Sequence, residues 1–341
     1  MNTKKRLLGM TLDELNDVVS EVGLPKYAAK QMADWLYKKK VSSVSEMTNI
    51  ALAKRHLLDE RFEVGASAPG HSMRSVDGTV KCLFAVNEGY FVESVYIPAS
   101  DRATLCVSSQ VGCKMGCLFC MTGRQGFTAN LTSNEILNQI QSIPESSSLT
   151  NLVFMGMGEP LDNTKELFKA LEIITASYGY AWSPKRVTVS TIGIGKGLAR
   201  FLEESDCHLA VSLHSPFAEE RLSLMPIEKV YPLYDILSLI KKYDFTHQRR
   251  VSFEYIVFKD LNDSLKHADA LAKLLSDIPC RINLIRFHNI PGAEFNSPDA
   301  KKMEDFRGRL NAKGLICTIR VSRGEDIFAA CGMLSTAKGE K

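Results

Sequence analysis

The sequence lacks any long apolar run. None of its 341 residues belongs to a stretch of the roughly 18 apolar residues that a membrane helix needs. The basic N-terminus, MNTKKRLLGM, reaches Asp13 and Glu14 after only a brief apolar patch, so the hydrophobic segment of a secretion signal is missing too. We therefore expect a cytoplasmic protein that has no membrane partner.

The chain also has little excess charge. A formal net charge of +3 is too small to indicate a nucleic-acid partner by itself, and there is no internal repeat or low-complexity tract. The nine cysteines are an odd number, and in a reducing compartment clustered thiols favour metal binding or catalysis over structural disulfides. The apolar share of 45%, in contrast, fills a substantial core, which excludes a disordered or fibrous chain.

The first third of the chain predicts two accessory units. A capping box formed by Thr11 and Glu14 begins a helix, and further helical pattern follows, so we expect a helical domain over residues 1–64. The composition then changes to turn-forming and β-forming residues. TVKCLFAV and YFVESVYI, separated by the turn at 87–89, predict a β-hairpin extension over residues 65–101.

From residue 102 onwards, apolar β-rich runs alternate with amphipathic helical patterns. This alternation predicts an α/β fold with a parallel sheet, and seven strand candidates suit a complete or partial (β/α) barrel. Functional side chains of such folds lie at the C-terminal ends of the strands. We expect this core over residues 102–335 and a C-terminal tail over 336–341. The strand candidates are ATLCVSS, LTNLVFM, RVTVSTI, HLAVSLH, VSFEYIVF, INLIRF and LICTIRVS.

Three cysteines, Cys113, Cys117 and Cys120, form a CxxxCxxC motif directly after the first of these strands. A closed zinc site normally needs four ligands, often in two pairs, and the chain has no second pair of matching spacing, so zinc requires a distant His or Cys. A [4Fe-4S] cluster held by three thiolates leaves one iron free for an exogenous ligand. The motif therefore favours a cluster that binds a cofactor or substrate.

These features resemble the radical S-adenosylmethionine superfamily, and within it the RlmN/Cfr family, whose members methylate adenine in RNA. The resemblance rests on motifs in unbroken order from Glu93 to Cys331: DRATLCVSSQVGC, MGMGEPLDN, STIG, SLHSP, NDSLKHA, INLIRF and RGEDIFAACG. It implies a partial radical SAM barrel with an N-terminal RNA-binding domain. It also implies a [4Fe-4S] cluster on the three cysteines and two molecules of S-adenosylmethionine per turnover.

The resemblance further implies roles for three other residues. Cys331 matches the cysteine that is methylated and carries the methyl group, and Cys106 matches the thiol that forms a transient disulfide with it. Glu93 matches the proton acceptor, and its apolar strand neighbours would make the carboxylate a stronger base. Without the family context, Cys331 is equally typical of a small core residue and Glu93 of an outward-facing strand carboxylate.

Several strand-end residues become cofactor ligands by the same resemblance, although each alone is also typical of an ordinary strand terminus. His288 stands where the family often has asparagine, and Asn289 follows it, so the sequence leaves open which of the two contacts the cofactor. The expected cofactor-binding residues are Gly158, Glu159, Ser190, Ser212, Leu213, His214 and His288.

The implied substrates are adenine in the peptidyl-transferase centre of 23S rRNA and the anticodon-adjacent adenine of tRNA, each as an unpaired or extruded nucleotide. DRATL and CVSSQVGC favour methylation at carbon 2. The alternatives are Cfr-like methylation at carbon 8 and, from another class, a non-catalytic zinc-stabilised RNA-binding protein. The family expectation is a monomer with a flavodoxin-type electron donor. Lys38 to Lys40 are candidate phosphate contacts, although such runs are more often only solvated.

Overall fold

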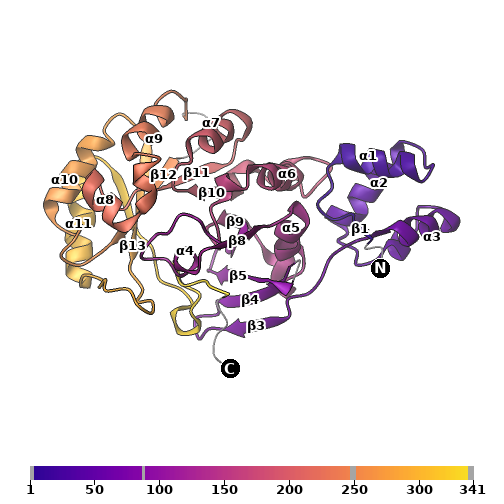
Figure 1. Cartoon of the computed structure of the whole chain (residues 1–341), viewed down its shortest axis with the longest axis horizontal. Helices are drawn as coiled ribbons and strands as arrows, with labels where there is room; N and C mark the ends of the chain where they lie inside the picture. The colour runs from indigo at the N-terminus through magenta and orange to yellow at the C-terminus, as the bar shows by residue number, and fades with distance from the viewer. Residues whose placement is uncertain (1–3, 87–88, 246–250, 337–341) are drawn as a thin grey trace.

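One ten-stranded sheet organises the chain (Figure 1). The computed structural model describes residues 4–86, 89–245 and 251–336. Strands β14, β13, β12, β11, β10, β9 and β6 are parallel neighbours in this order, and β5, β4 and β3 continue the sheet beyond β6 in antiparallel pairing. The seven predicted core strands are all confirmed. The bounds are His71–Arg74 (β3), Val80–Ala85 (β4), Phe91–Pro98 (β5), Ala103–Cys106 (β6), Asn151–Phe154 (β9), Val187–Thr191 (β10), His208–Ser212 (β11), Val251–Val257 (β12), Cys280–Arg286 (β13) and Ile316–Ile319 (β14).

Helices cover one face of the parallel part. They connect successive parallel strands, as the alternating pattern predicts. Among the described residues, no helix combines the length and hydropathy that a membrane crossing requires. The crossover helices are α5 (Ser133–Gln141), α6 (Thr164–Thr175), α7 (Gly195–Glu204), α8 (Ala218–Leu224), α9 (Leu233–Ile240), α10 (Leu265–Leu274) and α11 (Ala300–Ala312).

The two faces of the parallel sheet differ in chemistry. Side chains that alternate along the strands, such as Leu105, Val189 and Phe253, are buried in one core cluster together with residues of the helices. The register places Ser212 and Glu254 opposite one another on the other face. The helix-covered face is therefore apolar, whereas the second face, called the polar face below, combines polar side chains with apolar ones such as Ile256.

The sheet curves around its polar face. Arg320, directly after β14, donates from Nη1 to the sulfur of Met155, directly after β9, at 3.3 Å, although four strands lie between them. Strands lie about 4.8 Å apart, so a flat sheet would separate these two ends by about 24 Å, which no arginine side chain spans. The parallel strands thus form a partial barrel, and the predicted fold class is confirmed.

The N-terminal segment packs α1 (Leu12–Glu21), α2 (Tyr27–Ala33), a π-helical turn (Asp34–Lys38) and α3 (Leu52–Arg61) beside a pair of short parallel strands, β1 (Lys5–Arg6) and β2 (Phe62–Glu63). The predicted capping box is present: Glu14 N donates to Thr11 Oγ1 and Thr11 N donates to Glu14 Oε2. The predicted second helix is divided, because its last turn is π-helical.

The N-terminal segment docks on α5 and α6 of the core. The Asn134 side-chain amide donates to the carbonyl oxygens of Leu8 and Gly65, at 3.1 and 3.0 Å. Lys169 Nζ lies 2.8 Å from Glu14 Oε1. Both ends of the N-terminal segment are therefore fixed to the barrel by polar contacts.

The predicted hairpin is antiparallel, with Ala85 of β4 opposite Phe91 of β5. Its turn residues Asn87 and Glu88 lie outside the described residues, as does the predicted C-terminal tail beyond Thr336.

Gly9 provides a test of the docking contact. Its φ is +92°, and a Cβ at this position would lie 2.4 Å from the backbone nitrogen of Asn134. Gly9→Ala should lower the free energy of unfolding by about 3 kcal/mol, because left-handed strain and a backbone clash act together. Gly314→Ala is the matched control: Gly314 has a φ of +87°, but a Cβ there would meet no atom within 4 Å, so about 1 kcal/mol is expected. Equal losses in chemical denaturation would contradict the role of this contact.

Candidate active site

The predicted site residues lie on the polar face of the curved sheet. Cys106 at the end of β6 pairs with Val95 of β5, so Glu93, two residues before Val95, lies on the same face as Cys106. The register continues through β9 and β10 to Ser190, and through β11 to Ser212. Four predicted residues from four strands thus surround the inside of the barrel.

The three-cysteine motif forms a loop between β7 (Gln110–Gly112) and α4 (Met121–Gln125). Burial is the main cause that raises the pKa of all three thiols, to about 12 for Cys113. In Cys117, repulsion from the neighbouring thiolates Cys120 and Cys113 adds to this effect. Neutral thiols are thus favoured until a cationic group binds, and metal-bound thiols are deprotonated outright.

The donor chemistry of this loop fits an iron-sulfur cluster. The three sulfurs are close enough to influence one another, and thiolates are the ligands that such clusters use. In the described parts of the chain, no three His, Cys, Asp or Glu side chains are arranged to hold a single metal ion. A [4Fe-4S] cluster instead distributes its ligands over separate iron atoms.

The segment that carries Cys331 is held against the cysteine loop. Met121 N donates to the carbonyl oxygen of Gly332 at 2.8 Å, and Thr122 Oγ1 donates to that of Leu334 at 2.6 Å. A few residues on, Ser335 N donates to the Glu93 carboxylate at 3.0 Å. The C-terminal segment therefore bridges the cysteine loop and Glu93.

Cys331 and Cys106 lie close together inside this arrangement. Both are free thiols, and Cys331 is exposed whereas Cys106 is buried. Burial raises the pKa of Cys106 to about 12, and the nearby Cys331 contributes in the same direction. Two thiols from opposite ends of the core are thus close enough to influence one another.

Glu93 is buried, but its surroundings are less apolar than its strand neighbours indicate. Its Oε1 lies 3.0 Å from Lys81 Nζ, which β4 presents on the same face of the sheet. Sequence reasoning missed Lys81 because the partner comes from the adjacent strand of the hairpin. The carboxylate is therefore ion-paired and also accepts a backbone hydrogen bond.

The glycine-rich turn after β9 packs on the segment after β6. Gly158 has a φ of +99°, and a Cβ there would lie 2.5 Å from Gln110 Cβ, so packing within the chain already requires glycine. Glu159 is buried and accepts hydrogen bonds from Thr191 Oγ1 at 2.6 Å and from Ile192 N at 3.0 Å. Burial nevertheless raises its pKa to about 7.

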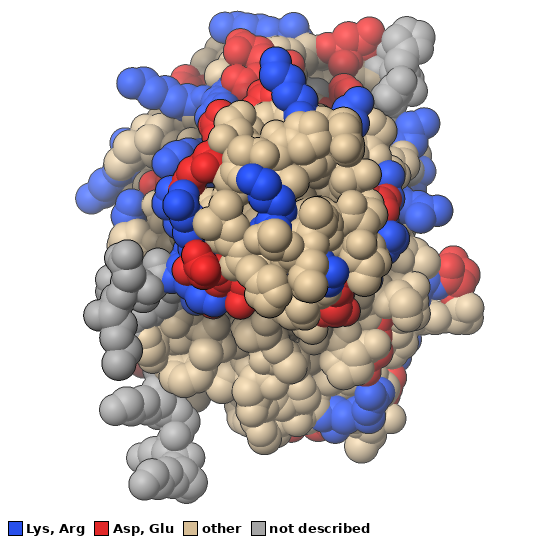
Figure 2. All heavy atoms as spheres, turned by 90° about the vertical axis from the view of Figure 1, so that its right-hand side faces the viewer, with Lys and Arg blue, Asp and Glu red and all other residues tan. Residues whose placement is uncertain are grey.

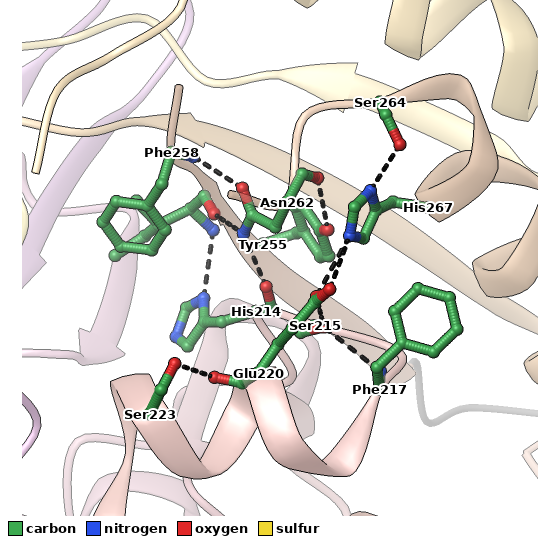
Figure 3. Close-up of polar contacts among 11 residues, drawn as sticks. His214, Ser215, Phe217, Glu220, Ser223, Tyr255, Phe258, Asn262, Ser264 and His267 are labelled. Carbon is green, nitrogen blue, oxygen red and sulfur yellow. Dashed lines mark hydrogen bonds and ion pairs between the residues drawn. The ribbon is translucent and has the colours of Figure 1, made fainter. Parts of the chain in front are cut away.

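Figure 3 shows the hydrogen bonds that fix His214, whose backbone is left-handed with a φ of 58°. Ile256 N donates to its Nδ1 at 3.0 Å, so a neutral ring carries its proton on Nε2. Burial lowers the pKa of this imidazole to about 3. Asn262 donates to the His214 carbonyl oxygen at 2.6 Å, and the ring of Phe119 contacts the imidazole edge-on. His214 thus links β12 to the cysteine loop as a neutral hydrogen-bond donor.

The remaining cofactor candidates differ in accessibility. Leu213 is fully buried, and its N–H already donates to the carbonyl oxygen of Glu254 at 3.0 Å. His288 is buried whereas Asn289 is exposed, so the residue that faces inwards is His288. The His288 Nδ1 lies 3.4 Å from Glu325 Oε1 without hydrogen-bond alignment.

Two charged residues of the polar face escaped sequence reasoning, Glu254 on β12 and Arg320 after β14. Glu254 interrupts the apolar run VSFEYIVF, and a charge inside a buried strand was the available signal. Arg320 ends the last strand, which is where functional groups of a barrel are expected.

The lysine run at 38–40 is largely engaged with its own surroundings. Lys38 and Lys39 each lie 3.7 Å from Asp34, and Lys40 Nζ donates to Ser146 Oγ at 2.7 Å. Figure 2 shows that Lys and Arg on this end of the molecule are interspersed with Asp and Glu around a mostly uncharged centre. The run therefore offers less free positive charge than its sequence indicates.

The barrel, the three-cysteine loop after its first strand and the glycine-rich turn beside it define a radical S-adenosylmethionine protein. The profile of the Radical SAM superfamily matches residues 107–272. A second profile, the ribosomal RNA large subunit methyltransferase N-terminal domain, matches residues 5–64.

The chain belongs to the RlmN family of radical SAM RNA methyltransferases. It is 73% identical over 338 residues (99% of this chain, 98% of the relative) to the probable dual-specificity RNA methyltransferase RlmN of Parabacteroides distasonis. It is 39% identical over 347 residues (98% and 96%) to the dual-specificity RNA methyltransferase RlmN of Desulfotalea psychrophila. The crystal structure of a radical SAM methyltransferase from Sphaerobacter thermophilus covers 97% of this chain and 99% of its own at 36% identity, with a TM-score of 0.91.

Family membership decides between the alternatives left open by the sequence. The relatives are RlmN enzymes, which favours the RlmN assignment over the Cfr-like one and over a non-catalytic zinc protein. Family membership also establishes the cofactors, which are a [4Fe-4S] cluster and S-adenosylmethionine.

Each of the single substitutions Cys113→Ala, Cys117→Ala and Cys120→Ala should abolish the cluster. Two thiolates leave a second iron without a protein ligand, in addition to the iron that is open in the wild type. Iron, acid-labile sulfide and visible absorbance after anaerobic reconstitution measure the loss. Cys317→Ala is the control, because this buried cysteine lies on the helix-covered face and should leave the cluster intact. Full cluster content in any one of the three variants would contradict the ligand assignment.

Proposed function

We propose that this protein methylates carbon 2 of adenine in the peptidyl-transferase centre of 23S rRNA and at the anticodon-adjacent position of tRNA. The observation that carries the proposal is the meeting of Cys106, Cys331 and Glu93 beside the three-cysteine loop. The names of the relatives, which describe dual-specificity RNA methyltransferases, support both RNA classes.

Carbon 2 of adenine explains why two further thiols are needed. It is an electron-poor amidine carbon without a lone pair, so it does not displace a methyl group from a sulfonium directly. When bound, the cluster and S-adenosylmethionine would supply one-electron chemistry: they would generate a carbon radical and take back the single electron that the radical adduct must lose together with its ring proton. The residues of the chain must then hold the methyl group, position it at the base and release the product.

We assign the methyl carrier to Cys331. It is reachable by solvent, as a group that meets both cofactor and RNA must be, and Gly332 and Leu334 hold its segment against the cysteine loop. Once Cys331 is joined through its methylene carbon to adenine, Glu93 accepts the ring proton. Its buried carboxylate is directed towards the same segment by Ser335 N.

Cys106 completes the reaction. Its thiolate attacks the sulfur of Cys331, so a sulfur–sulfur bond forms while the bond from Cys331 sulfur to the methylene carbon breaks. The electron pair of that bond stays with the carbon, which takes up a proton as the methyl group of the product. The transient disulfide must then be reduced before the next turnover.

The cofactor-binding residues line the rest of the polar face. Glu159 offers carboxylate oxygens to the cofactor's ammonium group, and the neutral His214 offers a donor on Nε2. Ser190, Ser212 and the inward-facing His288 supply further polar groups, while Gly158 contributes through its backbone and the buried Leu213 by packing beside them. We further propose a monomer that works in the cytoplasm with a flavodoxin-type electron donor.

Product analysis tests the function. RNA from a deletion strain should lack 2-methyladenosine in both 23S rRNA and tRNA, and the wild-type gene should restore it. Mass spectrometry of digested RNA with authentic 2-methyl and 8-methyl standards measures the outcome. Loss of 8-methyladenosine, or an unchanged nucleoside profile, would reject the proposal.

Cys106 and Cys331 should fail at different stages. Cys106→Ala should stall after RNA has become attached to Cys331, because no thiolate remains to attack the sulfur. The purified variant should carry RNA that survives denaturation, whereas Cys331→Ala and the double variant Cys106→Ala, Cys331→Ala should carry none. Denaturing gels with nucleic-acid staining separate these outcomes. RNA that is released from Cys106→Ala by denaturant alone would contradict the two-thiol mechanism.

A further inference from the structure

Arg320 crosses the inside of the barrel. It follows β14, and its backbone nitrogen extends the ladder by donating to the carbonyl oxygen of Leu284 at 2.8 Å. Its guanidinium reaches the Met155 sulfur on the opposite side at 3.3 Å. Cys106 pairs with Val153, two residues before Met155, so the Met155 side chain lies on the same face of the sheet as the Cys106 thiol. The guanidinium is thus placed beside the thiol by contacts from two distant strands.

Glu254 holds the guanidinium in place. Its Oε1 accepts from Asn283 Nδ2 at 2.8 Å, whereas its Oε2 has no hydrogen-bond donor among the described residues and lies 3.5 Å from Arg320 Nη1. Glu254 is buried, and an unpaired buried carboxylate is costly, so it needs a cation beside it. The Arg320 side chain remains partly exposed, with 34% of its surface accessible. Its charge is therefore available to neighbours other than Glu254.

Those neighbours are the two thiols. Arg320 lowers the pKa of both Cys106 and Cys331, in opposition to the effect of burial, while Glu254 raises the pKa of Cys331. The strand partners of Cys106, Val95 and Val153, are apolar and contribute no charge.

Other charges on this face offset one another. Glu93 and Lys81 share the face with Cys106, but they form an ion pair at 3.0 Å. Arg320 is therefore the cation whose position favours a negative sulfur at Cys106.

We propose that Arg320, held by Glu254, is a positioning residue that keeps positive charge against Cys106 and so favours its thiolate form. The inference deepens the proposed function, on which it rests, because the resolving thiol must be ionised to attack Cys331. Glu254 contributes to this effect by holding the guanidinium in position.

The test measures the ionisation of Cys106 without requiring turnover. Cluster-loaded protein with the Cys331→Ala substitution is treated anaerobically with methyl methanethiosulfonate from pH 6 to pH 10, and modification of the Cys106 peptide is followed by mass spectrometry. Arg320→Gln should shift the pH profile of the rate upwards by about one unit, which slows modification about tenfold at neutral pH. Arg320→Lys should restore most of the rate, and Glu254→Gln should shift the profile upwards by less than Arg320→Gln does, because the guanidinium is then no longer held against Cys106.

Slower modification distinguishes this role from a merely structural one, because loosened packing would speed modification in every variant. Arg323→Gln is the matched control, since it removes a positive charge from the same segment and should leave the profile unchanged. An unchanged or downward-shifted profile in Arg320→Gln or in Glu254→Gln would overturn the proposal. If Arg320→Gln does not fold, the sign of the Glu254→Gln shift still decides. If Arg320→Gln shifts the pH profile as expected but Cys106→Ala carries no RNA adduct, only the proposed function is rejected.

Discussion

The hydrogen-bond register between β5, β6 and β9 fixes the side of the sheet on which the chemistry takes place. Val95 pairs with Cys106 and Cys106 with Val153, so a slip of one residue would turn Cys106 towards the helices and remove it from Glu93. The slip would also expose Leu105, which is fully buried in the core. The same apolar burial that stabilises the fold therefore determines where the reactive thiol points.

Cys331 depends on this sheet without being part of it. Its segment is held by backbone contacts to α4 and by the hydrogen bond from Ser335 to Glu93. A segment fixed at its flanks, with a reachable side chain between them, suits a residue that must meet more than one reaction partner. In the proposed mechanism the sheet carries the proton acceptor and the second thiol, and the loop carries the methyl group.

The strands and the cysteine loop were predictable because their signals are local. Apolar runs such as HLAVSLH need only their own residues to indicate a buried strand, and CxxxCxxC indicates its ligand set by spacing alone. The pairing of Glu93 with Lys81 was not predictable, because it depends on which strand lies beside β5. The contact of Arg320 with Met155 requires the curvature of the whole sheet, which no local pattern encodes.

The site holds two groups of thiols that differ in how their negative charge is stabilised. Cys113, Cys117 and Cys120 repel one another when ionised, and burial keeps them protonated, so a bound cluster is what makes them thiolates. In the proposed mechanism Cys106 is not a cluster ligand and must be ionised when it attacks. Burial is the main cause that raises its pKa to about 12 even with Arg320 beside it, and a thiol with so high a pKa is a poor nucleophile at neutral pH. A nearby guanidinium that does not bond to the sulfur reduces this penalty without occupying the thiol, and a carboxylate behind it keeps the guanidinium in place. The geometry of β12 and β14 supplies both groups.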